Sequence, residues 1–407
     1  MQDTVNLKPG APTPSFADLQ DAVTRLVPLV EGAADAAESQ SHQADKVAAA
    51  FRANGLYATL TPKALGGLEL PFVEAMQLIE QVSHADGSAG WCMMVQGVMG
   101  ASAGAFLPDE GARTVYPDGA NVTVCGQGVP RGYATPVEGG YAIHGNWGYA
   151  SGVYHAEWIH SGCFVMDGEE MKVDDQGHPE IILAHHPRDT IELTGNWDVL
   201  GLRGTGSFDY TVAGDKVFVP AVQCYPFDGA EVQRGDQRYS TGLVGLTTWG
   251  HTGWALGVGR RALDELVKLA HERSDVFGPL HSRASFQQDF ADAEAKYRSA
   301  RALAYGAWDD MAETHERGER ETLEQVAVIR LAMRHIHNVI SEITTFAHRA
   351  TRGASLRKGV LQRCYRDTHS GTQHILLADE ILQACGKVLL GAASDNAAWN
   401  VLGLTDV

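Results

Sequence analysis

The chain has 407 residues, of which 50 are acidic and 32 are Lys or Arg, so its formal net charge is −18. This balance argues against a nucleic-acid-binding protein, because a phosphate backbone is bound by clustered cations, and against a polybasic membrane contact. With 44% hydrophobic residues the chain can bury a large core, and its length predicts about two to three structural units. The six scattered cysteines, with no C-x-x-C, predict reduced thiols in a cytoplasmic protein.

Residues 1–120 are predicted to form an N-terminal helical domain. Apolar residues recur at three- and four-residue steps over 16–30, over 47–56 up to a C-cap at Gly55, and over 71–82. The start of the chain lacks the basic residues and apolar run of a signal peptide. Residues 87–108 carry no charge but contain five glycines, so we expect a buried helix here and no membrane span.

Residues 121–228 are predicted to form a β domain, and residues 229–407 a C-terminal helical bundle. Runs rich in Val, Ile and aromatic residues, separated by Gly, Pro and Asp, predict strands at 122–124, 141–144, 158–165, 181–184, 209–212 and 216–219. An apolar stripe over 323–349 predicts a long helix, and long helices joined by short loops suggest a bundle. The expected fold class is therefore α+β.

Two patterns are interpreted as structural. The segment from Gly257 to Ala262 matches G-x-G-x-x-A, but its helical flanks offer no βαβ unit, so we expect close helix packing and no dinucleotide site. The histidine pairs at 185/186 and 335/337 have no acidic partner at metal-binding spacing, and no metal site is predicted.

Glycine-rich turns with aromatic and hydroxyl groups are the clearest chemical signal. They are Gly-Gly-Tyr-x-x-x-Gly-x-Trp-x-x-x-Ser-Gly at 139–152 and Gly-Leu-Arg-Gly-Thr-Gly-Ser at 201–207. On pattern alone, ordinary β turns explain them as well as a site for a flat polar ring. An Asp-x-Ser-x-Gly-Trp turn at 86–91 precedes them, and Arg366-Asp367 with His374 follows.

In combination these motifs resemble the acyl-CoA dehydrogenase fold, over about residues 15 to 392. The resemblance is closest to its two-component flavin-dependent monooxygenases of the p-hydroxyphenylacetate hydroxylase type. It implies an N-terminal helical domain, a central β-barrel or sandwich domain and a C-terminal four-helix bundle, with a flavin between the last two. The hydroxyl or backbone of Ser151 would then meet flavin N5. The other implied cofactor contacts are Cys125, Gly126, Trp147, Tyr149, Gly152, Arg203 and Ser207.

A second resemblance concerns the tail of the cofactor. Arg273, Phe277 and Gln287 fit an R-x-x-x-F-G-x-x-L…Q segment of acyl-CoA dehydrogenases, in which the Arg binds the pyrophosphate of FAD held by a neighbouring subunit. Arg suits this role because its fork meets two phosphate oxygens. The match implies FAD, with FMN as the alternative, and a homo-oligomer that is expected to be a homotetramer.

The choice between dehydrogenase and oxygenase depends on the catalytic base. Most acyl-CoA dehydrogenases place a Glu before a Gly-Thr near the C-terminus, but here Ser370 precedes Gly371-Thr372. The loss of this carboxylate removes roughly 10²- to 10⁴-fold in rate. It favours an oxygenase, in which reduced flavin and O₂ form a carbon-4a hydroperoxide that oxidises an aromatic or heteroaromatic small molecule.

In such an oxygenase His374 and Ser151 would be the catalytic residues. His374 would orient or deprotonate a phenol-like substrate, because the pKa of an imidazole lies near the working pH, or stabilise the hydroperoxide. The expected substrate-binding residues are Trp91, Gln96, Trp249 and His251. No NAD(P)H site is recognisable, which implies a separate NAD(P)H:flavin reductase. Two alternatives stay open: an acyl-CoA dehydrogenase-like enzyme or oxygenase acting on a CoA thioester, and a non-catalytic scaffold that has lost its cofactor.

Overall fold

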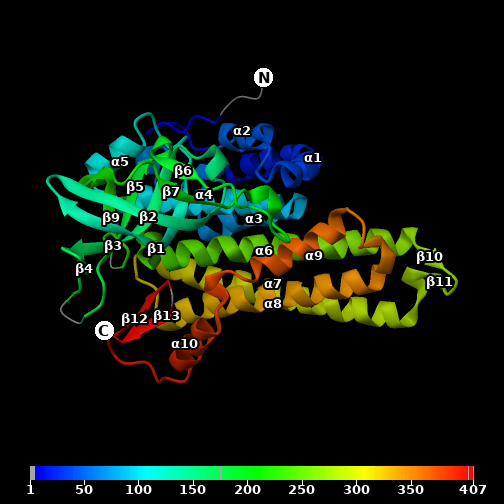
Figure 1. Cartoon of the computed structure of the whole chain (residues 1–407). Coiled ribbons are helices and arrows are strands. Elements are labelled where there is room, and N and C mark those ends of the chain that lie inside the picture. The colour runs from blue at the N-terminus through cyan, green and yellow to red at the C-terminus, as the bar shows by residue number, and fades with distance from the viewer. Residues whose placement is uncertain (1–4, 175–176, 229, 402, 407) are drawn as a thin grey trace.

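The N-terminal part of the chain folds into helices that lie above the long C-terminal helices (Figure 1). The computed structural model describes residues 5–174, 177–228, 230–401 and 403–406. Its N-terminal helices are α1 (Phe16–Gln40), α2 (Asp45–Ala53), α3 (Phe72–Ala85), α4 (Gly87–Phe106) and α5 (Asp109–Val115).

Capping and apolar spacing explain these helices. Ser15 and Asp18 form a reciprocal capping box at the start of α1, which satisfies free N–H groups of the first turn. The helices predicted over 16–30 and 71–82 are confirmed as parts of α1 and α3. The helix predicted over 47–56 ends earlier, at Ala53, because Gly55 adopts a left-handed backbone (φ 71°) and Leu56 starts a 3₁₀ turn.

Helix α4 is the uncharged segment, and it is buried along almost its whole length, as predicted. Small residues allow this: a Cβ on Gly90 would lie 2.0 Å from Ser83 Oγ, and one on Gly104 would lie 2.8 Å from the Pro62 ring. Among the described residues, no helix combines the length and apolar character that a membrane crossing requires. The glycines of α4 therefore serve close packing inside the protein.

The middle of the chain forms a mixed β-sheet. In the described residues its strands follow the order β6-β7-β2-β1-β3-β5-β9, with β4 paired to β3 and β8 paired to β2. β1 pairs antiparallel with β2 and parallel with β3. The bounds are β1 (Val124–Val137), β2 (Gly140–Ala150), β3 (Trp158–Asp167), β4 (Glu170–Met171), β5 (Ile181–Pro187), β6 (Ile191–Leu193), β7 (Phe208–Val212), β8 (Val217–Pro220) and β9 (Cys224–Pro226).

All six predicted strands have a counterpart, but the first was misplaced. It was predicted at 122–124, whereas β1 begins at Val124 and continues to Val137. Glycines and Pro130 interrupt the apolar residues of this long strand, so its sequence lacks the continuous apolar pattern by which a strand is predicted. The pairing of β1 with β3 also shifts register between Gln127 and Gly132, as at a β-bulge.

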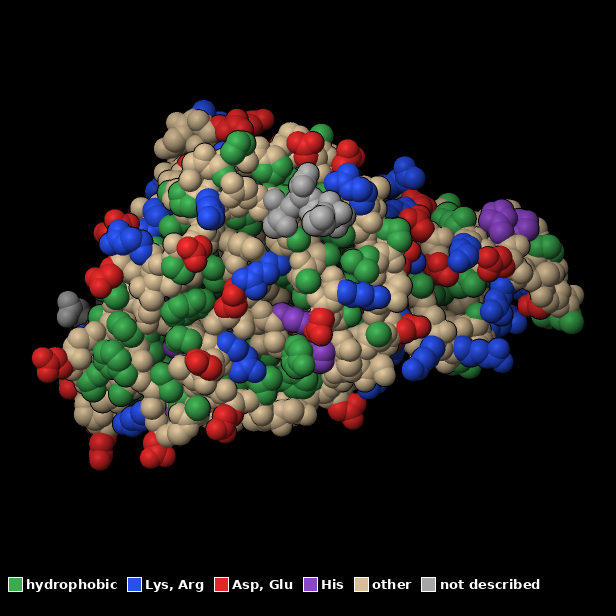
Figure 2. All heavy atoms as spheres, turned by 90° about the horizontal axis from the view of Figure 1, so that it is seen from above, with side chains coloured by type: hydrophobic (Ala, Val, Ile, Leu, Met, Phe, Trp, Pro, Cys, Tyr) green, Lys and Arg blue, Asp and Glu red, His purple; other side chains and the backbone are tan. Residues whose placement is uncertain are grey.

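Long helices dominate the C-terminal part, with α6, α7 and α8 side by side and the hairpin of β10 and β11 at their far end (Figure 1). Seen from above, this end projects as a narrower arm on which basic and acidic side chains alternate (Figure 2). The elements are α6 (Gly242–Glu272), β10 (Ser274–Asp275), β11 (Gly278–Pro279), α7 (Ala284–Glu316), α8 (Leu323–Thr351), α9 (Val360–Gly371), α10 (Asp379–Leu389), β12 (Ala397–Asn400) and β13 (Gly403–Asp406).

The G-x-G-x-x-A segment lies inside α6 and serves helix packing, as predicted. A Cβ on Gly257 would lie 2.2 Å from the Glu80 carbonyl oxygen of α3, and one on Gly259 would lie 2.4 Å from Ile340 of α8. Both neighbouring helices therefore approach the α6 backbone more closely than any side chain would allow.

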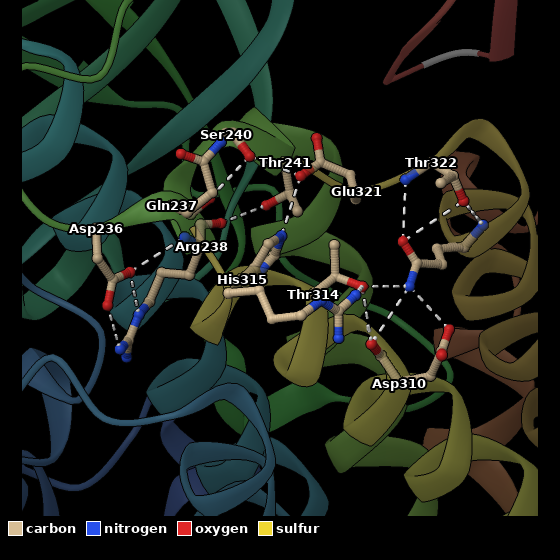
Figure 3. A network of polar contacts seen from close by, with 12 residues as sticks. Asp236, Gln237, Arg238, Ser240, Thr241, Asp310, Thr314, His315, Glu321 and Thr322 are labelled. Carbon is tan, nitrogen blue, oxygen red and sulfur yellow. Dashed lines mark hydrogen bonds and ion pairs between the residues drawn. The ribbon is translucent and has the colours of Figure 1, made fainter. Parts of the chain in front are cut away.

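A polar network joins the entry into α6 to the turn between α7 and α8 (Figure 3). Ser240 Oγ donates to Glu321 at 2.6 Å, and His315 Nε2 lies 3.0 Å from the same carboxylate. Asp236 pairs with Arg238 at 2.6 Å at the start of this connection. Glu321 lies between Ser240 and His315, so the histidine does not contact the serine hydroxyl and the three residues are not a nucleophilic triad. They instead hold the segment before α6 against the turn between α7 and α8.

Candidate active site

Ser151 lies in a tight turn directly after β2, at the edge of the β domain. The backbone of Tyr149 and of Gly152 is left-handed, with φ of 63° and 77°. Gly152 N–H donates to the Thr205 carbonyl at 2.8 Å, which joins this turn to the loop at 201–207. A Cβ at Gly152 would lie 2.8 Å from Gln96 Nε2, so the tight turn requires glycine.

A chain of hydroxyl groups ends on Ser151. Thr205 Oγ1 donates to the Leu202 carbonyl at 2.7 Å and lies 2.7 Å from Ser207 Oγ, which is 2.6 Å from Ser151 Oγ. Trp91 Nε1 donates to Ser151 Oγ at 3.0 Å. Since each hydroxyl has one hydrogen and that of Thr205 goes to a carbonyl, Ser207 donates to Thr205 and Ser151 to Ser207. Ser151 Oγ is left with one acceptor lone pair.

Three histidines from three different elements meet beside Trp91. His251 comes from α6, His337 from α8, and His374 follows α9. The His251 ring centroid lies 4.1 Å from that of His374, 4.9 Å from that of Trp91 and 6.1 Å from that of His337. Trp254 closes the group at 5.0 Å from Trp91. The fold thus brings four segments that are far apart in sequence to one point, which we call the imidazole cluster.

Burial keeps these imidazoles neutral at physiological pH. It lowers the pKa of His337 and of His374 to about 4. Burial, helped by the neighbouring His374 and His337, also lowers the pKa of His251 well below its usual value. The sequence-based expectation of a His374 pKa near the working pH is therefore wrong, because it took no account of desolvation.

Hydrogen bonds define which nitrogen of His374 faces the site. Its Nδ1 accepts the backbone N–H of Leu376 at 3.3 Å, so the neutral ring carries its hydrogen on Nε2 and presents a donor. His251 Nδ1 is buried and finds no hydrogen-bond partner among the described residues. The cluster therefore offers a donor and a vacant ring nitrogen to a bound molecule.

Asp367 ties the second turn to the helical bundle. Its carboxylate accepts the Leu202 N–H at 2.6 Å, and Ser370 Oγ accepts the Gly201 N–H at 2.9 Å. Burial, reinforced by the nearby charge of Asp86, raises the pKa of Asp367 to about 7. Asp86 itself caps α4 by accepting the N–H of Ala89 at 2.9 Å. The first two bonds fix the loop that carries Ser207 against α9, and the third caps the helix that carries Trp91.

The predicted contacts Cys125, Gly126 and Gln96 lie behind the Ser151 turn. Cys125 is fully buried at the start of β1, with its Sγ 3.4 Å from the position of a Cβ on Gly152. Gly126 has φ of 142°, and its backbone packs on the His160 carbonyl. The buried Gln96 amide lies beside Gly152 and within reach of the buried Tyr57 hydroxyl.

Two tryptophans predicted to line the site lie elsewhere. Trp147 is fully buried in the β domain, where its Nε1 donates to the Gly162 carbonyl at 2.7 Å and its ring stacks on Tyr210. Trp249 is fully buried too, and its Nε1 donates to the Phe72 carbonyl at 2.9 Å. Both indoles thus have their partners inside the protein, and they support the site from behind without facing it.

The remaining predicted residues lie on the surface. Tyr149 is 69% exposed, beside Trp197. Arg203 is half-buried in the loop at 201–207, with its Nε buried and unpartnered among the described residues and a side-chain nitrogen 3.6 Å from Asp198. Arg273, Phe277 and Gln287 lie at the outer end of the bundle, around β10 and β11. Within one chain the structure does not bring these three to Ser151.

Sequence reasoning missed three members of the site. His337 stands in the apolar stripe of α8, Trp254 lies three residues after His251 on α6, and Thr205 lies within the second turn. A histidine within an apolar helical stripe was the available signal for the first. Trp254 and Thr205 gave no such signal, because in the sequence they resemble an ordinary core residue and an ordinary turn residue.

Comparison with known proteins identifies the family. Residues 16–108 and 249–379 match the N-terminal and C-terminal domains of acyl-CoA dehydrogenase. Indole-3-acetate monooxygenase of Pseudomonas putida is 31% identical over 381 residues, which cover 93% of this chain and 94% of that protein. The FADH₂-dependent resorcinol hydroxylase oxygenase component of Rhizobium sp. (strain MTP-10005) is 31% identical over 215 residues, 51% of this chain and 50% of that protein. The chain belongs to the flavin-dependent monooxygenases of the acyl-CoA dehydrogenase family.

Solved structures of this monooxygenase family share the fold. XiaF from Streptomyces sp., in complex with FADH₂ and glycerol, superposes with a TM-score of 0.82 at 19% identity, covering 92% of this chain and 96% of that one. The predicted family and fold are thereby confirmed. The structure of XiaF holds FADH₂, and the relative from Rhizobium is named as FADH₂-dependent.

The residues around the Ser151 turn fit a flavin. A reduced flavin ring carries both N–H donors and carbonyl acceptors along one edge, and it therefore requires partners of both kinds. This monooxygenase offers the acceptor lone pair of Ser151 and the Nε–H donor of Arg203, which is buried and has no partner among the described residues. The cavities of 690 and 600 Å³ on the described surface lie elsewhere and include none of these residues.

Proposed function

We propose that this chain is the oxygenase component of a two-component system and that it oxidises an aromatic or heteroaromatic small molecule. The observation that carries the proposal is the placement of Trp91, which donates to Ser151 on one side and packs on His251 and His374 on the other. Relatives named for indole-3-acetate and resorcinol support an aromatic substrate. The indole of Trp91, with the imidazoles of His251 and His374 beside it, would pack on a flat ring.

Each residue of the site has a defined task in this reaction. When bound, reduced flavin supplies the electrons that activate O₂. Ser151 would hold the ring edge of the cofactor through its free lone pair. His374 would orient the substrate by donating Nε2–H to an oxygen or ring nitrogen, a role that its neutral state favours over deprotonation. The vacant His251 Nδ1 would accept a hydrogen bond from the same ligand.

A dehydrogenase is disfavoured because the position of its base is otherwise engaged. Ser370 precedes Gly371, and its hydroxyl accepts the Gly201 N–H. The neighbouring carboxylate of Asp367 is bonded to Leu202 N–H within the protein. An enzyme that takes an α-proton from a thioester needs a free carboxylate within hydrogen-bond reach of the substrate.

FAD rather than FMN, and a homotetramer, form the second part of the proposal. Phe277 is 72% exposed beside Arg273 at the outer end of the bundle. Next to them, the 690 Å³ cavity between α7 and α8 is lined by Lys296 and by the arginines 283, 349 and 352, together with two carboxylates. These cations would bind the phosphates of a cofactor whose ring lies in another subunit, which FMN is too short to reach.

A separate NAD(P)H:flavin reductase would supply the reduced cofactor. The dinucleotide-like glycines of this chain lie inside α6 and are covered by α3 and α8, so they support no nicotinamide site here. The relative from Rhizobium is itself an oxygenase component.

Stopped-flow oxidation of reduced flavin tests the proposal. The chain is mixed anaerobically with reduced FAD, then with O₂, with and without an indole or phenol. We expect oxidised FAD to return more slowly than it does free in solution, and oxygenated product to appear. Return at the rate of free FAD, without product, contradicts the proposal. Bleaching of oxidised FAD by an acyl-CoA would support the thioester-dependent alternative instead.

Two histidine variants sharpen the test. His374→Ala should still oxidise reduced FAD but form much less product, because substrate orientation is lost. His369→Ala is the matched control, since His369 packs on Tyr365 outside the imidazole cluster. Equal product loss in both variants would remove the role assigned to His374.

A further inference from the structure

Two histidines and an aspartate meet where the α1–α2 connection packs on the β domain. His42 lies between α1 and α2, Asp45 is the first residue of α2, and His155 ends the 3₁₀ turn at 153–155. One ring nitrogen of each histidine and a carboxylate oxygen of Asp45 all lie within 4.8 Å of one another. His155 Nε2 is 2.9 Å from Asp45 Oδ1. We call these three residues the His-Asp-His group.

These spacings suit a single small cation. Zn²⁺ binds imidazole nitrogen and carboxylate oxygen at roughly 2.0–2.2 Å, which places ligand atoms about 3.3 Å apart in tetrahedral geometry. Asp45 is exposed, and its carboxylate supplies a negative charge at neutral pH. The group then offers one negative charge and two imidazoles, the donor set that borderline divalent metals prefer over Mg²⁺.

The surroundings of His42 prepare its ring for metal binding. Its Nδ1 lies 3.0 Å from the Gln43 carbonyl oxygen and 3.3 Å from Gln40 Nε2. The shorter contact favours a hydrogen on Nδ1, since a carbonyl can only accept, and this tautomer leaves the Nε2 lone pair free. Metal-binding histidines commonly donate their second N–H to a backbone carbonyl in this way. The ring is also held in place, because it stacks on Tyr154 at 3.8 Å with an interplanar angle of 8°.

We propose that the His-Asp-His group is a binding site for a divalent transition metal of the Zn²⁺ class, with water completing its coordination. The site would clamp the α1–α2 connection onto the β domain. His155 lies four residues after Ser151, and a Cβ on Gly206 would lie 2.9 Å from that of His42. A metal here would therefore hold both turns of the active site against α1 and α2. The sequence predicted no metal site, because residues 42 and 155 are separated by more than a hundred positions.

Calorimetric titration of the full-length chain with ZnCl₂ tests the proposal. We expect one tight site per chain and a rise in Tm on saturation. His42→Ala and Asp45→Asn, which change exposed or half-buried side chains, should each weaken binding by at least about tenfold, because even the loss of an outer partner of a metal ligand costs about 10- to 100-fold. MgCl₂ should not compete.

His84→Ala is the matched control. His84 Nε2 lies 2.9 Å from Asp264, the same contact as that between His155 and Asp45, but no third ligand is found beside them among the described residues. This variant should bind Zn²⁺ as the wild type does. Co²⁺ provides a second readout that is independent of activity and of folding energy: its ligand-field absorption should appear in the wild type and in His84→Ala, and be lost in His42→Ala.

Three outcomes overturn the proposal, and the absence of a tight site in the wild type is the first of them. The second is Zn²⁺ binding of equal strength in wild type, His42→Ala and Asp45→Asn, which would assign the signal to adventitious surface histidines. The third is equal weakening in His84→Ala, which would show that any paired histidine suffices.

Discussion

Replacement of Ser151 by alanine removes the hydroxyl on which two buried groups depend. Trp91 Nε1–H loses its acceptor, and Ser207 Oγ loses its donor. Trp91 and Ser207 are 6% and 3% exposed, so water replaces these partners poorly. A buried group left unpaired costs roughly 1–3 kcal/mol. Ser207 Oγ keeps its bond to Thr205, so its loss adds only about 1 kcal/mol, and we expect Ser151→Ala to lower the free energy of unfolding by about 2–4 kcal/mol.

The size of the chain converts this cost into a modest thermal shift. With an unfolding entropy of roughly 2.1 cal/mol/K per residue, 407 residues give about 0.85 kcal/mol/K. The Tm of Ser151→Ala should therefore fall by about 2–5 °C in differential scanning calorimetry. In stopped-flow experiments the same variant should oxidise reduced FAD at a rate closer to that of the free cofactor, because the ring edge loses its acceptor.

Ser161→Ala separates the two effects. Ser161 Oγ also bonds two buried partners, at 3.0 Å to His186 and 2.8 Å to Tyr210, but inside the β domain. It should cost a similar amount of stability and leave flavin oxidation unchanged. The reasoning is refuted if both variants alter flavin oxidation equally, or if Ser151→Ala leaves Tm unchanged.

Three further predictions follow from buried groups. Gly257→Ala should lower the unfolding free energy by roughly 1–3 kcal/mol or more, because its Cβ would lie 2.2 Å from the Glu80 carbonyl. The control Gly306→Ala, which has open space around it, should instead raise the unfolding free energy by roughly 0.5–1 kcal/mol. Equal denaturation midpoints in the two variants would contradict this. Arg363→Leu should cost about 3–5 kcal/mol, since it leaves buried Asp86 without its nearest cation; urea denaturation with unchanged stability would argue against it. The free energy of unfolding should fall as the pH is lowered from 6.5 to 4. Burial lowers the pKa of His185 and of His337 to about 4, so over this range the unfolded chain binds protons that the folded chain does not bind. This difference costs roughly 2 kcal/mol per imidazole by pH 5. Asp367, with its raised pKa, acts in the opposite direction over this range, and a denaturation midpoint that rises on acidification would show that the histidines are not buried neutral.

The sequence predicted the order of helices, β domain and helices, and most helix positions, because apolar spacing and capping residues are local signals. Its candidates Ser151 and His374 both contact Trp91 in the structure, and their catalytic roles stay predictions. It could not place Trp147 and Trp249, whose motif positions suggested a ligand but whose indole N–H groups bond to carbonyls inside the protein. The protonation of His374 was missed for a related reason, since desolvation arises only when α6, α8 and α9 close around the ring.

Contacts between remote segments were beyond any single-sequence pattern. Asp367 reaches Leu202 across 165 positions, and His337 joins the imidazole cluster from a stripe that otherwise looked like core. The long strand β1 was also hidden, because Pro130 and several glycines interrupt its apolar pattern. In each case tertiary packing, which local propensity does not encode, decided the outcome.

We expect this chain to transfer oxygen from O₂ to an aromatic compound, with reduced flavin as the electron donor. Mass spectrometry of the product formed under ¹⁸O₂, with the chain, reduced FAD and an indole or phenol substrate, tests it most directly. The product should carry one ¹⁸O atom, and its yield should be greatly reduced in His374→Ala and unchanged in His369→Ala. Product that carries only oxygen from water, or a substrate that is consumed without O₂, would contradict it.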